Sequence, residues 1–187
     1  MTDEVTFRPV APDCWEDFER LFESRGGPKT CWCMAWRSME KFPSVERPAV
    51  AKKREMKKRI LSGAPVGLLG YIGSEPVAWC SVAPRTTYRA SMSDVMPGDQ
   101  DHGIWSIACF FVSRPWRGQG MFQRLIAAAE EYAGKNGATL LEAYPVDPDS
   151  PSYRFGGFLP AFEQAEYTLC GRKGARRHIV RKSLSRN

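Results

Sequence analysis

The stretch IWSIACFFVSRPWRGQGMFQRLIAAAEEYA, residues Ile104–Ala133, changes its periodicity on either side of a short basic turn. From Ile104 to Val112 nearly every residue is apolar, aromatic or β-branched, which is typical of a strand covered on both faces. From Phe122 onward, apolar residues recur at helical spacing until Gly134. We therefore expect a buried strand, a turn at Ser113–Gly120 and an amphipathic helix.

The turn has the chemistry of an anion-binding site. Gly118 and Gly120 allow a phosphate to approach the backbone closely, and Arg117 adds a positive charge. The first turn of the following helix has backbone N–H groups without an internal partner, and the helix dipole favours negative charge there. A pyrophosphate is the group that we expect this turn to bind.

Two common phosphate-binding loops fit the turn poorly. A P-loop has Lys followed by Ser or Thr after its last glycine, whereas Met121 and Phe122 stand there. A dinucleotide fingerprint has a third glycine, and this chain has Gln123 at that place. Glu142 does lie about twenty residues further on, where that fingerprint has a ribose-binding acid, so this alternative stays open.

The turn resembles the acetyl-coenzyme A loop of the GNAT acyltransferases, in which Arg or Gln is followed by two residues, Gly, one residue, and Gly or Ala. The chain departs from this pattern only at Phe122, which replaces the last small residue. The resemblance implies acetyl-coenzyme A as the cofactor. It implies that its pantetheine arm pairs with the backbone of Phe110, Phe111 and Val112. It also implies that its pyrophosphate is bound by the amides of Arg117, Gly118, Gln119, Gly120, Met121 and Phe122.

The rest of the chain has the element order of that family. Strands are expected at 5–10, 65–73, 75–85, 138–144, 167–171 and 177–183, and further helices after Asp13, at 48–61 and at 159–165. The implied fold is α/β (α+β), with a mixed central sheet of about seven strands flanked by about four helices. The resemblance implies that this sheet is splayed between its fourth and fifth strands. We expect a single domain, residues 1–187.

Composition narrows the class of protein. An apolar fraction of 43%, without a membrane-length apolar run, indicates a globular protein with no membrane partner. The N-terminus does not resemble a signal peptide, and six cysteines without scaffold-like spacing indicate reduced thiols, so we expect a cytoplasmic location. The net charge of +6 is concentrated in residues 52–59 and 172–182. These runs lack interleaved aromatic residues, so we expect no nucleic-acid partner, and a homodimer stays open.

Acetyl transfer to an amine needs a base for the ammonium, and donors that stabilise the developing oxyanion. Glu142, on the strand across the implied splay, is the first candidate base, although a solvent-facing carboxylate is the alternative interpretation. Asp147, just past that strand, is the second candidate. Some family members carry a glutamate base early in the central strand, near the place of Ser106 in this chain.

The reaction also needs an acid for the departing thiolate. Many family members carry a tyrosine in the last helix for this role, but Phe162 stands at the matching position. Tyr144 or Tyr153 is the substitute that we consider. Cys109 lies beside the expected thioester, where a covalent route competes with a buried structural thiol, and His102 is either a loop base or a surface histidine.

The segment Cys31–Arg37 (CWCMAWR) is unusual for a loop. Two cysteines are soft metal ligands, but no paired histidines complete a zinc site, so we expect no metal. Core packing and a wall of the acceptor pocket are the two interpretations that stay open. If the resemblance holds, the wall of that pocket includes Trp32, Trp36, Trp79 and Trp105.

The function that follows is an acetyl-coenzyme A-dependent N-acetyltransferase, which transfers an acetyl group directly to a primary amine of a small molecule. A catalytically silent coenzyme A-binding regulatory module is the alternative, because the usual tyrosine is missing. Acetylation of a protein amine also stays open. The identity of the acceptor is not predicted.

Overall fold

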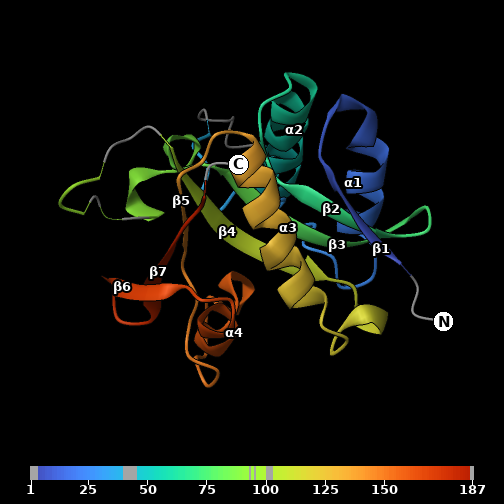
Figure 1. The fold of residues 1–187 in the computed structure, drawn as a ribbon. Helices are drawn as coiled ribbons and strands as arrows, with labels where there is room; N and C mark the ends of the chain where they lie inside the picture. Colours follow the sequence, from blue (N-terminus) through green and yellow to red (C-terminus); the bar gives the residue numbers. More distant parts are fainter. Residues whose placement is uncertain (1–3, 40–45, 93, 95, 100–102, 186–187) are drawn as a thin grey trace.

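The computed structural model describes residues 4–39, 46–92, 94, 96–99 and 103–185. The strands of this part of the chain form one mixed sheet in the order β1-β2-β3-β4-β5-β7-β6 (Figure 1). Their bounds are Val5–Pro9 (β1), Leu68–Ile72 (β2), Glu75–Pro84 (β3), Ile104–Val112 (β4), Leu140–Ala143 (β5), Thr168–Lys173 (β6) and Arg177–Ser183 (β7). The predicted mixed sheet of seven strands is confirmed.

Helices cover both faces of the sheet (Figure 1). On one face, α1 (Trp15–Glu23) and α2 (Pro48–Leu61) enclose an aromatic core. In this core the rings of Phe18 and Phe22 stack, with their centroids 4.0 Å apart. On the other face, α3 (Met121–Lys135) and α4 (Leu159–Gln164) pack against apolar residues of β3, β4 and β5. The apolar spacing read from the sequence therefore corresponds to the buried side of each helix.

The parallel pairing of β4 with β5 is short. It extends only from Ile104↔Leu140 to Ile107↔Ala143. Beyond Ile107, β4 continues to Val112, whereas β5 ends two residues before Pro145, which has no N–H to donate to a ladder. The predicted splay between the fourth and fifth strands is confirmed, and it opens beside the second half of β4.

A bulge in β4 lies where the opening begins. In the pairing of β4 with β3, Cys109 is opposite Ser81 and Ile107 is opposite Val82, so Ala108 is the extra residue. Such a bulge changes the direction in which neighbouring side chains point. As a result, the consecutive residues Ala108 and Cys109 line one and the same cavity.

The first helix begins differently from the prediction. The helix expected after Asp13 is preceded by the 3-10 turn Pro12–Cys14, which contains Asp13, so Asp13 is not its N-cap residue and no side chain caps the helix at Cys14. Asp13 instead forms an exposed ion pair with Arg8 at 3.3 Å. The strand expected at 138–144 is shorter than predicted, since only Leu140–Ala143 form ladder hydrogen bonds.

Gly157 lies against the ring of Phe122, the residue that departs from the GNAT pattern, and there is no room for a side chain at this position. Its φ of +85° and ψ of −179° lie in a region that glycine alone adopts readily. A Cβ atom at this position would lie 2.3 Å from Cζ of Phe122 and 3.1 Å from Cε2 of Phe162. Gly157 therefore provides the space into which the Phe122 ring packs.

We predict that Gly157→Ala lowers the free energy of unfolding by about 3 kcal/mol, because backbone strain and overpacking add. Gly137→Ala is the matched control, since Gly137 has φ +83° but nothing within 4 Å of its added Cβ. This control carries backbone strain alone and should lose about 1–2 kcal/mol. Urea unfolding measures both losses, and equal losses would contradict the packing argument.

Candidate active site

A groove of about 420 Å³ lies beside the second half of β4 and the start of α3. Its walls come from β4, from the turn before α3, from the first residues of α3 and from the segment 154–158. Of the residues predicted to bind the cofactor, eight line it: Phe110, Phe111, Val112, Arg117, Gly118, Gly120, Met121 and Phe122. Gln119 is outside this set and donates its side-chain amide to the carbonyl of Pro115 at 2.8 Å.

The turn presents its backbone to this groove. Gly118 and Gly120 both have φ +73°, and no atom lies within 4 Å of where a Cβ would stand on either residue. No side chain caps α3 at Gly120, so the N–H groups of its first turn face no capping oxygen. Arg117 donates through Nε to the carbonyl of Val112 at 2.7 Å, which ties the turn to the end of β4.

Phe122 is accommodated without closing the groove. Its ring lies 4.4 Å from that of Phe110 and meets the ring of Phe162 edge-on at 5.9 Å. Phe162 is fully buried, so the position of the usual family tyrosine belongs to the core of this chain. Phe122 and Phe162, the two side chains that differ from the family pattern, therefore pack against each other.

A second cavity adjoins the groove at the β4 bulge. We call it the inner pocket, and its volume is about 140 Å³. It shares Phe110, Phe111 and Phe155 with the groove. The complete lining is Pro28, Cys31, Cys33, Ala35, Trp36, Ala108, Cys109, Phe110, Phe111 and Phe155. The unusual segment around Cys31–Arg37 thus forms one wall of this pocket.

Only one of the four tryptophans predicted for the acceptor wall lies there. Trp36 lines the inner pocket. Trp32 and Trp79 are buried in the core beneath α1, and Trp105 is buried on the opposite face, edge-on to Tyr132 at 5.4 Å. None of these three lines the groove or the inner pocket, because strand alternation directs Trp79 and Trp105 into the core and Trp32, which lies in a turn, stacks on Phe22.

The thiols of the inner pocket are packed against one another. Cys33 and Cys109 are hydrogen-bonded, and the indole N–H of Trp79 donates to Sγ of Cys33 at 2.9 Å. Burial raises the pKa of Cys33 well above its ordinary value, so this thiol stays protonated. In the described part of the chain the one histidine, His178, bonds elsewhere, which favours the structural interpretation of Cys109.

No group of three or more metal-binding side chains occurs among the described residues. His178 is hydrogen-bonded through Nε2 to Asp147 at 2.7 Å, and Asp147 is half-exposed and lines neither cavity. The other histidine considered, His102, lies outside the residues that the structure describes.

The three residues predicted as catalytic form one buried chain of hydrogen bonds. The register of β4 and β5 places Ser106 opposite Glu142. The Tyr144 hydroxyl lies 3.2 Å from Oγ of Ser106 and donates to Oε1 of Glu142. None of the three lines the groove or the inner pocket. Their positions fit support of the β4 bulge better than direct proton transfer.

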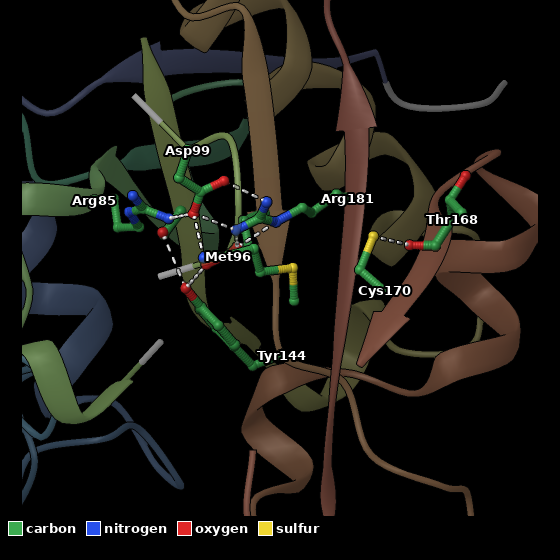
Figure 2. A network of polar contacts seen from close by, with 9 residues as sticks. Arg85, Met96, Asp99, Tyr144, Thr168, Cys170 and Arg181 are labelled. Atoms are coloured by element: carbon green, nitrogen blue, oxygen red, sulfur yellow. Dashed lines mark hydrogen bonds and ion pairs between the residues drawn. The ribbon is translucent and has the colours of Figure 1, made fainter. Parts of the chain in front are cut away.

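The hydrogen bonds of Ser106, Tyr144 and Glu142 connect to a cluster of ion pairs, part of which Figure 2 shows. Glu142 accepts from Nε of Arg181 at 2.6 Å, and Arg181 also holds Asp99 at 2.6 Å. Arg85 binds the same carboxylate of Asp99 at 2.6 Å. An acid that is fully buried and already paired with a guanidinium is a poor base, which weighs against the predicted role of Glu142.

Sequence reasoning missed Asp99 and Arg181. Asp99 lies in the long loop before β4 and pairs with a strand more than eighty residues away, so no local pattern marks it. Arg181 is opposite Glu142 in the register of β5 and β7. The available signal was the pair of opposite charges, Glu142 and Arg181, on neighbouring strands. To recognise that they are opposite each other, one must already know the register of β5 and β7.

An aromatic cluster stands at the junction of the two cavities. Tyr153 is 39% exposed, and its ring lies 6.2 Å from that of Trp36 and 6.1 Å from that of Phe155. Its φ of +59° is unusual for an aromatic residue and is typical of a functionally constrained position. The guanidinium of Arg177 lies over the rings of both Trp36 and Tyr153. Of this cluster, only Trp36 (as a wall of the acceptor pocket) and Tyr153 (as a possible acid) were singled out from the sequence.

The fold and the cavities agree with the comparison against known families. The sequence matches the acetyltransferase (GNAT) family over residues 15–156. The chain therefore belongs to the GNAT family, whose general reaction is the acetyl-coenzyme A-dependent transfer of an acetyl group. Curated proteins provide no match to the sequence.

Solved structures share this fold at low sequence identity. A GNAT-family protein from Desulfovibrio desulfuricans is 18% identical, with a TM-score of 0.56, and the match covers 97% of this chain and 100% of that one. The enzyme AAC(6')-Ib with ribostamycin and coenzyme A is 15% identical, with a TM-score of 0.60 and coverage of 97% and 94%. Its complex with acetyl-coenzyme A is 14% identical, with a TM-score of 0.61 and the same coverage.

Within the described residues, no helix has the length and apolar character needed to cross a membrane. The cytoplasmic location stays a prediction.

We predict that Asp99→Asn lowers the free energy of unfolding by about 3 kcal/mol at neutral pH, because it removes the carboxylate that the buried guanidinium groups of Arg85 and Arg181 share. Hydrogen bonds from Arg181 and then Arg85 hold the pKa of Asp99 below its ordinary value. A depressed folded-state pKa contributes stability above the unfolded-state value of about 3.9, and that contribution is lost as the pH falls.

The difference between wild type and Asp99→Asn should therefore shrink between pH 7 and about pH 2, measured by urea unfolding at each pH. The exposed pair Arg8–Asp13 provides the control. Asp13→Asn should cost less than about 1 kcal/mol at either pH. A constant loss for Asp99→Asn across the pH range would contradict the ion-pair explanation.

Proposed function

We propose that this chain is an acetyl-coenzyme A-dependent N-acetyltransferase that acts on a primary amine of a small molecule. The observation that carries the proposal is the meeting of the groove and the inner pocket at the β4 bulge, where they share Phe110, Phe111 and Phe155. One cavity suits the acetyl donor and the other suits the acceptor. A direct transfer needs both reactants side by side in this way.

The groove has the features that the donor requires. The turn offers open backbone at Gly118 and Gly120 for the pyrophosphate, with positive charge from Arg117 and Arg154 at its rim. Beyond Ile107, β4 pairs with β3 on one edge, but its other edge, on the side of β5, has no strand partner among the described residues and can bind the pantetheine arm through its backbone. Acetyl-coenzyme A would supply the activated acetyl group as a thioester.

The reaction forms a C–N bond and breaks the C–S bond. The acceptor ammonium gives up its proton to solvent, since no acidic side chain lines either cavity, and the departing sulfur takes up a proton. We assign this proton to the hydroxyl of Tyr153. Tyr153 is not itself in the lining of either cavity, but its partly exposed ring contacts Trp36 and Phe155, which are. The buried Phe162 cannot donate a proton. Because the usual tyrosine is replaced by Phe162, a catalytically silent coenzyme A-binding module is the second candidate function. Acetyl transfer to any amine would exclude this second candidate.

Ser106, Tyr144 and Glu142 are assigned a positioning role. Their hydrogen bonds join β4 to β5 immediately before the strands part. Tyr144 also packs in the same apolar cluster as Ala108, the extra residue of the bulge. Removing one of these groups would shift the bulge rather than remove a transferred proton.

Isothermal titration with acetyl-coenzyme A tests the donor site. We expect a dissociation constant on the order of micromolar, and a loss of about 100-fold or more in the double variant Arg117→Ala, Gly120→Asp, which replaces positive by negative charge at the turn. Arg124→Ala is the control, because Arg124 is exposed on α3 and lies outside the groove. Absence of binding by the wild type would refute the proposal.

Tyr153→Phe tests the proton donor. With an acceptor found by screening amines for thiol release, we expect kcat to fall by about 100-fold while the dissociation constant for acetyl-coenzyme A stays unchanged. Tyr144→Phe should affect kcat less and stability more. The opposite pattern, in which Tyr144→Phe alone abolishes turnover, would return the acid role to Tyr144.

A further inference from the structure

The inner pocket is built for an apolar group. Its ten lining residues include aromatic, aliphatic and thiol side chains, and none of them is acidic. An ammonium held there without a carboxylate would lose its hydration and gain no charged partner, which makes its burial unfavourable. The pocket therefore suits the hydrocarbon part of an acceptor and not a cationic part.

The volume of the inner pocket limits that hydrocarbon part. The pocket measures about 140 Å³. An apolar cavity of about 150 Å³ in another protein stays dry and binds benzene. The inner pocket can thus hold one six-membered ring or a branched aliphatic chain. A saccharide of several rings, polar on every side, fits neither its size nor its chemistry.

The guanidinium of Arg177 packs on Trp36, one of the residues that line this pocket. Arg177 is only 9% exposed, and its Cζ lies 4.3 Å from the ring of Trp36, which lines the pocket. Its Nη1 donates to the carbonyl of Met92 at 3.2 Å. No described carboxylate forms an ion pair with Arg177, although the charge of Asp94 acts on it. Its other N–H donors form no hydrogen bond with the described residues.

A second guanidinium lies behind the wall of the pocket. Arg37 is fully buried and donates to neutral oxygens, among them the carbonyl of Val66 at 2.9 Å and the hydroxyl of Tyr88 at 3.1 Å. No described acidic side chain neutralises it, and its positive charge reaches Cys109 in the pocket wall. The field around the inner pocket is therefore positive, which disfavours cations and favours anions.

We propose that the acceptor is an amino carboxylate with an apolar side chain, of the kind that apolar α-amino acids represent. Its side chain would fill the inner pocket, its carboxylate would bind the planar guanidinium of Arg177, and its amine would face the β4 bulge. This proposal rests on the acetyltransferase function proposed above. It separates this chain from AAC(6')-Ib, whose complex contains ribostamycin, because an aminoglycoside carries several ammonium groups.

The test compares acceptors that differ in one group at a time. Wild-type protein is assayed with acetyl-coenzyme A and thiol-release detection against leucine and phenylalanine, their carboxamides, glycine and ribostamycin. We expect kcat/KM to be about 10- to 100-fold higher for the two acids than for their amides, since a charge-assisted hydrogen bond is lost in the amides. Glycine should be poor because it leaves the pocket unfilled, and ribostamycin should not react.

Variants of Arg177 test the residue itself. Arg177→Met should remove the preference for the acid over the amide, and Arg177→Lys should keep part of it. Arg176→Gln is the matched control, since the neighbouring Arg176 is exposed and bonds to Ser152 Oγ at 2.9 Å. The ratio of the two kcat/KM values is the readout, because a general loss of structure would lower both values together.

The outcomes separate this inference from the proposed function. Equal acetylation of acids and amides, acetylation of ribostamycin, or binding of acetyl-coenzyme A without reaction of leucine or phenylalanine would each overturn the inference. The first two results would leave the acetyltransferase function standing. Failure of the wild type to bind acetyl-coenzyme A in titration would overturn both.

Discussion

The short parallel pairing of β4 with β5 is the constraint on which the site depends. Because the strands pair only up to Ile107 and Ala143, the rest of β4 has a free edge beside an opening. The extra residue Ala108 begins that free part and directs two consecutive side chains into the inner pocket. Had the pairing continued to Val112, hydrogen bonds to β5 would have occupied the backbone that the groove exposes.

Buried charge holds the two strands together just before they part. Glu142 on β5 bonds to Tyr144 and to Arg181 on β7. Arg181 and Arg85 in turn fix Asp99 in the loop before β4 (Figure 2). Breaking such a cluster at one member leaves an uncompensated buried charge, so its members act together. Arg177, by contrast, lies over the rings of Trp36 and Tyr153 and forms no ion pair with a described acid. The ion-paired arginines thus support the strands, and Arg177 is the one that we propose as the ligand for a carboxylate.

The fold followed from local patterns, but parts of the site did not. The strand at Ile104–Val112, the glycine turn and the helix after it carry their information in adjacent residues, so the order of elements could be predicted. The splay and most of the groove were implied by the resemblance of this turn to the GNAT family. Trp32, Trp79 and Trp105 were misassigned because aromatic composition does not reveal which face of an element is buried. Asp99, Arg181 and Arg177 could not be found, since their roles arise from contacts between distant segments whose register the sequence does not state.

The most direct test of the central claim, that groove and inner pocket form one site for transfer, is a crystal structure of the protein with coenzyme A. The account predicts that the pyrophosphate lies on the backbone at Gly118–Gly120, that the pantetheine arm follows Phe110–Val112, and that the thiol sulfur ends at the mouth of the inner pocket beside Cys109. Coenzyme A bound elsewhere, or with its sulfur directed away from the inner pocket, would contradict it.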